Sequence, residues 1–140
     1  MNAQLLEIGL LTAGAGQLAI AILNLWLVQL LKWEQDVAAM SVLVREVFQV
    51  HKIFITITVG LFGVWTLLFA GEMAYEPTRM AKALAAGIGL FWGIRTLLQV
   101  TYYSASHWKG KPKETAVHFT LLLVYGGMAC TYGLVVWGWQ

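Results

Sequence analysis

Charged side chains are scarce in this sequence. Nine Lys or Arg and seven Asp or Glu make up 11% of the 140 residues, whereas soluble proteins average about 25%. A soluble domain of this length exposes a large surface, which so few charges cannot cover. A single cysteine excludes a disulfide scaffold, and two prolines leave long stretches free to form helices. The scarcity of charge therefore excludes a soluble monomer and a disordered chain.

Apolar residues are abundant and occur in long runs. They form 59% of the chain. Residues 8–31 and 53–71 contain no Asp, Glu, Lys or Arg over 24 and 19 positions, and the same is true of residues 115–140. A fourth apolar run, residues 83–108, is interrupted only by Arg95. A bilayer core about 30 Å thick needs about 20 helical residues. We predict an all-α integral membrane four-helix bundle, one transmembrane domain with spans at about 5–31, 47–70, 80–102 and 116–139.

The basic residues predict how the spans are oriented. The first and third connections share one side and hold six of them, whereas Arg79 and Lys82 lie on the other side. Lys and Arg are enriched in cytoplasmic loops. We therefore expect an inner-membrane protein of a bacterium with both termini outside the cytoplasm. The bases are spread over short connections, so a nucleic acid is not an expected partner.

Small residues recur at helical spacing within the spans. The third span carries Ala85, Gly89 and Gly93 at intervals of four. Such stripes allow helix backbones to approach closely in lipid. They predict packing within the bundle, or a seam between copies in a homo-oligomer or a larger membrane complex.

Arg95 is the most informative polar residue, because it lies inside the third predicted span. An arginine at the centre of a membrane helix costs about 2.5–3.5 kcal/mol on insertion scales and needs a partner or water. Gln99 is one turn further along the same face, and Trp92 is three residues earlier, within reach for stacking. The alternative is that Arg95 snorkels to the interface, where Glu46 is a candidate partner.

Two histidines are predicted at a similar depth on separate spans. His51 is about a turn into the second span and His118 less than a turn into the fourth. Two such imidazoles could be the axial ligands of a haem b, or could bind a metal, and Arg95 would then neutralise a haem propionate. The alternative is that both histidines form hydrogen bonds at the interface.

Two amides lie seven residues apart on the first span, at Gln17 and Asn24. Amides in lipid commonly form hydrogen bonds between helices. The alternative is that they line the path of a small oligomeric channel or carrier.

These residues predict a binding or accessory protein as the leading function. The candidate ligand-binding residues share one membrane depth near the cytoplasmic leaflet; they are Arg95, Gln99, His51, His118, Trp92 and Tyr102, with Tyr103 as a further candidate. Arginine, amide, imidazole and aromatic groups suit an anionic amphiphile, such as a lipid head group or a quinone-like molecule. No nucleophile or general base has a clear partner, so the sequence leaves open whether the protein is an enzyme.

Three segments carry a resemblance to known proteins. They are VREVFQVHKIF at residues 44–54, FWGIRTLLQ at residues 91–99 and KETAVHF at residues 113–119. Over roughly residues 45–137 the chain resembles small four-span bacterial membrane proteins of uncharacterised function. The resemblance implies a fold but no mechanism.

Overall fold

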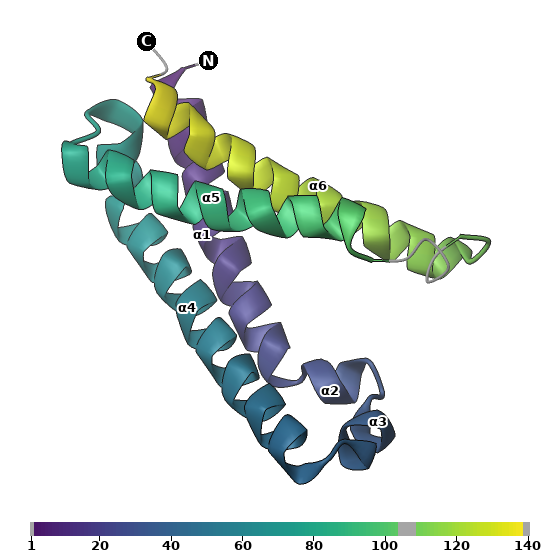
Figure 1. Ribbon diagram of the computed structural model, residues 1–140. Helices are drawn as coiled ribbons and strands as arrows, with labels where there is room; N and C mark the ends of the chain where they lie inside the picture. Colours follow the sequence, from purple (N-terminus) through teal and green to yellow (C-terminus); the bar gives the residue numbers. More distant parts are fainter. Residues whose placement is uncertain (1, 104–108, 139–140) are drawn as a thin grey trace. The chain divides into compact units, whose positions relative to one another are not determined.

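The computed structural model describes residues 2–103 and 109–138, which form helices and connections without any strand. Four of the helices are long and apolar enough to cross a membrane. The predicted fold class is therefore confirmed, and the helices are consistent with a four-helix bundle. The helices of the described residues are α1 (Ala3–Leu25), α2 (Leu27–Leu30), α3 (Glu34–Ala39), α4 (Val42–Tyr75), α5 (Arg79–Thr101) and α6 (Pro112–Trp137) (Figure 1).

The observed helices differ from the predicted spans mainly in the first half of the chain. α1 ends at Leu25, where a turn at Trp26 separates it from α2, although the apolar run continues to Leu31. α4 has 34 residues and extends five positions beyond the predicted span at each end. The apolar length of a segment measures what lipid can cover, whereas backbone hydrogen bonding can continue into charged turns.

The contacts divide the chain into two compact units. Unit 1 comprises Met1–Leu10 and Phe69–Gln140, and unit 2 comprises Leu11–Leu68. In unit 1, α5 and α6 form a hairpin and run side by side (Figure 1). In unit 2, the rest of α1 packs along α4.

The α5–α6 hairpin buries one face of each helix. On α5 the buried residues recur at intervals of three, four or seven positions: Ala81, Ala85, Ile88, Trp92 and Gln99. On α6 they are His118, Tyr125, Met128, Tyr132 and Val135. This spacing places each set on a single helix face. Gly89 allows the close approach, because a Cβ there would lie 3.0 Å from the Cβ of Tyr132.

Local sequence features explain where the two helices of the hairpin begin. The Thr78 hydroxyl caps α5 by accepting a hydrogen bond from the Ala81 backbone N–H at 3.1 Å. Pro112 occupies the first turn of α6, where its missing N–H leaves no hydrogen bond unmade. Gly110, just before α6, has a φ of 81°, a conformation that favours glycine. These features determine where α5 and α6 begin.

Candidate functional site

Arg95 lies six residues before the end of α5, partly exposed, and its side chain contacts three neutral groups. Its guanidinium carbon is 5.0 Å from the ring centroid of Tyr125 and 5.6 Å from that of Tyr103. Both distances are within the range of a cation–π interaction. Its Nη1 also donates to Oε1 of Gln99 at 3.3 Å. Among the described residues of unit 1, no carboxylate forms a salt bridge with this guanidinium.

Gln99 connects Arg95 to His118. The Gln99 side chain is only 5% exposed, and its Nε2 lies 3.1 Å from Nδ1 of His118. An amide nitrogen can only donate, so Nδ1 of His118 is the acceptor in this contact. The amide therefore uses its oxygen for Arg95 and its nitrogen for His118, and α5 and α6 share one polar network.

Aromatic rings continue from this network toward the middle of the hairpin. The rings of Trp92 and Tyr125 stack with centroids 5.2 Å apart at an interplanar angle of 24°. Phe91 meets Trp92 edge-on at 5.3 Å. Trp92 is 2% exposed and Tyr125 is 8% exposed. These rings exclude water from one side of the Arg95 network.

We define the Arg95 cluster as Arg95, Gln99, Tyr103, His118 and Tyr125. Four of the six predicted site residues lie in or against this cluster, namely Arg95, Gln99, His118 and Trp92. The predicted Tyr102 is 79% exposed and contacts the ring of Tyr103 edge-on. The stacking partner of Trp92 is Tyr125, which is not among the predicted site residues. Tyr125 is seven positions after His118, and that spacing on one helix face is the signal that identifies it.

The second predicted histidine belongs to unit 2. His51 is exposed, on α4 nine residues after its start. His118 is 9% exposed, and its Nδ1 bonds Gln99. Among the described residues, no group of three or more His, Cys, Asp or Glu side chains is arranged to hold a metal ion. Ligation of a haem b by His51 and His118 stays a prediction.

The two amides of α1 differ in their surroundings. Nδ2 of Asn24 donates to the Lys52 carbonyl at 3.1 Å and to Oγ1 of Thr56 at 2.6 Å, both on α4. Gln17 is fully buried, and its Nε2 donates to the Ala13 carbonyl of its own helix at 3.2 Å. Asn24 therefore bonds across a helix interface, as one alternative in the sequence analysis expected. The channel hypothesis stays a prediction.

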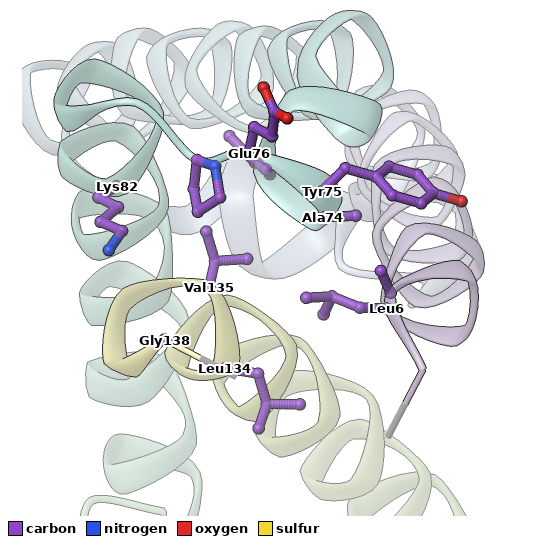
Figure 2. Close-up of a pocket in the computed structure, with 11 residues that line it drawn as sticks. Leu6, Ala74, Tyr75, Glu76, Lys82, Leu134, Val135 and Gly138 are labelled. Carbon is purple, nitrogen blue, oxygen red and sulfur yellow. The ribbon is translucent and has the colours of Figure 1, made fainter. Parts of the chain in front are cut away.

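A separate hollow lies at the other end of the hairpin (Figure 2). It has a volume of about 470 Å³, and Leu6, Leu134 and Val135 contribute apolar side chains to its lining. Glu76 and Lys82 also line it. The phenol of Tyr75 turns toward α1, where it donates to Oε2 of Glu7 at 3.0 Å (Figure 2). The charged groups of this hollow therefore include both signs, unlike the Arg95 cluster.

Comparisons with protein-family models, curated proteins and solved structures find no match to this chain. The resemblance to small four-span bacterial membrane proteins therefore stays a prediction, and the functional hypothesis depends on the Arg95 cluster itself.

Proposed function

We propose that this protein is a membrane binding or accessory protein whose Arg95 cluster holds the anionic group of an amphiphile, such as a lipid head group or a quinone-like molecule. One observation carries the proposal. Among the described residues of unit 1 the guanidinium contacts an amide and two phenol rings, so its hydrogen bonding is partly met while none of these groups neutralises its charge. A charge within a membrane span is costly, and an anionic ligand would offset that cost.

The depth of Arg95 supports a ligand that resides in the bilayer. Arg95 is about 9 Å along the helix axis from the end of α5, given a rise of 1.5 Å per residue. An anionic head group can reach that depth while its chains remain in the hydrocarbon. Large apolar side chains near Arg95 face outward, including Leu97, which is 60% exposed. These side chains suit contact with acyl chains.

The proposal includes a location and partners. The excess of basic residues in the first and third connections supports a bacterial inner membrane, with the Arg95 cluster toward the cytoplasmic leaflet and both termini outside. The lipid bilayer is the proposed partner. Assembly with a second copy, or within a larger membrane complex, is a further expectation that the stripes of small residues support.

The test compares two arginines of the same helix. The full chain is incorporated into nanodiscs that contain equal amounts of phosphatidylglycerol and phosphatidylcholine, and the retained lipids are identified by native mass spectrometry. We expect Arg95→Leu to lose the preference for the anionic lipid, because it removes the charge that attracts the head group. The control is Arg79→Leu, since Arg79 is exposed in the first turn of α5. Equal retention by wild type and Arg95→Leu would refute the proposed function.

A further inference from the structure

We infer that the group held at Arg95 is an oxyanion with two equivalent oxygens, which binds the edge of the guanidinium, and that Gln99 is the residue that positions this edge. The inference rests on the proposed function and makes it more specific. It favours a phosphodiester or a carboxylate over the carbonyl of a neutral quinone.

The contacts of Arg95 determine how a ligand approaches. The rings of Tyr103 and Tyr125 already supply its aromatic contacts. A guanidinium has five N–H donors in one plane, and Gln99 accepts from Nη1. The Tyr125 side chain is a second hydrogen-bond partner of Arg95, and the donors that these two groups do not use are available to a ligand. Two parallel N–H donors match the two oxygens of a carboxylate or phosphate, whereas a single carbonyl oxygen does not use the pair fully.

Gln99 is held from both ends. Its oxygen accepts from Arg95, and its nitrogen donates to Nδ1 of His118. If the amide rotated by half a turn, its nitrogen would face a guanidinium that can only donate, whichever ring nitrogen of His118 carries the proton. Because Gln99 and His118 are both buried, an unmade bond there is costly. The bond to His118 therefore anchors the far end of the amide, and the amide holds one corner of the guanidinium.

The neutrality of Gln99 is what keeps the site open to an anion. A glutamate at this position would have nearly the same shape, but its carboxylate would pair with Arg95 directly. Gln99→Glu would therefore supply the anion from within the protein. We expect it to block binding of an external oxyanion without loss of stability, because His118 can take the tautomer whose Nδ1 donates to the second carboxylate oxygen.

The experiment measures binding to the purified full chain in a neutral detergent by isothermal titration calorimetry. The probes are dioctanoyl phosphatidylglycerol, octanoate, inorganic phosphate and a neutral quinone with an eight-carbon chain. We expect phosphatidylglycerol and octanoate to bind the wild type at least about tenfold more tightly than the quinone. Arg95→Lys keeps the charge but lacks the planar fork, so we expect about tenfold weaker binding of both lipid anions. Gln99→Glu should abolish their binding while its melting temperature stays equal to or above that of the wild type.

Rescue tests the positioning role. His118→Asn retains a carbonyl oxygen that can accept from Gln99, so we expect it to bind phosphatidylglycerol better than His118→Ala does. A merely structural role of His118 would lower the melting temperatures of both variants and leave the affinities of the folded fractions equal. Equal affinities would overturn the positioning role of the pair.

The outcomes separate this inference from the proposed function. If Arg95→Leu loses anion binding but Arg95→Lys and Gln99→Glu bind like the wild type, the edge-on oxyanion is refuted and the proposed function stands. Equally tight binding of the quinone also refutes the inference. If inorganic phosphate binds as tightly as the lipids, the oxyanion chemistry stands and the amphiphile of the proposed function does not. If Gln99→Glu fails to fold, Arg95→Lys and the quinone decide the question.

Discussion

The α1–α4 pair of unit 2 and the α5–α6 hairpin of unit 1 differ in how their polar side chains are partnered. In unit 2, Asn24 of α1 donates to a backbone carbonyl and a hydroxyl of α4. In unit 1, the polar network of α5 and α6 contains a full positive charge whose partners there are an amide and two phenol rings. A neutral amide can be satisfied by the acceptors of a neighbouring helix. Neutral acceptors can satisfy the hydrogen bonds of a guanidinium, but they do not compensate its positive charge.

This difference separates a structural polar contact from the proposed binding site. The α1–α4 contact of unit 2 is close, because a Cβ on Gly63 would lie 2.9 Å from the carbonyl oxygen of Gly14. Removal of polar or small residues there should destabilise the hairpin. Removal of Arg95 should affect ligand binding and leave the stability of the unliganded protein almost unchanged.

The largest effect is expected from Gly63→Ala. The added methyl group meets the backbone of Gly14, which cannot rotate away, so we expect a loss of about 1–3 kcal/mol in the free energy of unfolding. Reversible unfolding in mixed micelles measures the change. The control is Gly87→Ala, because no atom of the described residues lies within 4 Å of the position of a Cβ at Gly87. An equal loss in both variants would mean that close α1–α4 packing is not the cause.

A smaller loss is expected from Asn24→Ala in the same unfolding measurement. The substitution removes the donor to Lys52 and Thr56, and interhelical hydrogen bonds in membrane proteins contribute about 0.6–1.7 kcal/mol. Thr101→Ala is the control, because the exposed Thr101 hydroxyl donates to the Leu97 carbonyl of its own helix. Stability like that of the wild type would remove the distinction between the two hairpins.

The smallest effect on stability is expected from Arg95→Leu in micelles without anionic lipid. The variant loses the cation–π contacts and leaves the buried Gln99 oxygen without its donor, which costs about 1–3 kcal/mol. Removal of a charge from a membrane span returns a similar amount, about 2.5–3.5 kcal/mol, so we expect a net change within about 0.5 kcal/mol. Added phosphatidylglycerol should stabilise the wild type by mass action and leave the variant unaffected. A loss of several kcal/mol without lipid would place Arg95 among the structural contacts.

The sequence predicts the helices of this protein better than their ends. The charge-free runs identify four helices because the bilayer requires apolar length. They do not identify the end of α1 at Leu25, since no proline or glycine marks the turn at Trp26. They also miss the charged turns of α4. Because α6 begins at Pro112, His118 is more than a turn and a half into its helix and buried, deeper than the sequence analysis expected.

The sequence predicts those contacts of the Arg95 cluster that join residues of one helix. Arg95 and Gln99 are four positions apart, and this spacing alone predicts their contact. The contacts of Gln99 with His118 and of Arg95 with Tyr125 connect two helices. Such contacts depend on the rotation and register of α6 against α5, which the pattern of apolar residues in lipid leaves undefined because α5 and α6 are apolar on both faces.

Cys130 gives the native chain a built-in reporter. It is the only cysteine in the sequence, and its side chain is exposed on α6. Twelve residues separate it from His118, which corresponds to about 18 Å along the helix axis. A spin label or fluorophore attached there would register bilayer depth at a known distance from the Arg95 cluster, with no substitution in the protein. Quenchers confined to one leaflet would then report on which side of the membrane α6 begins.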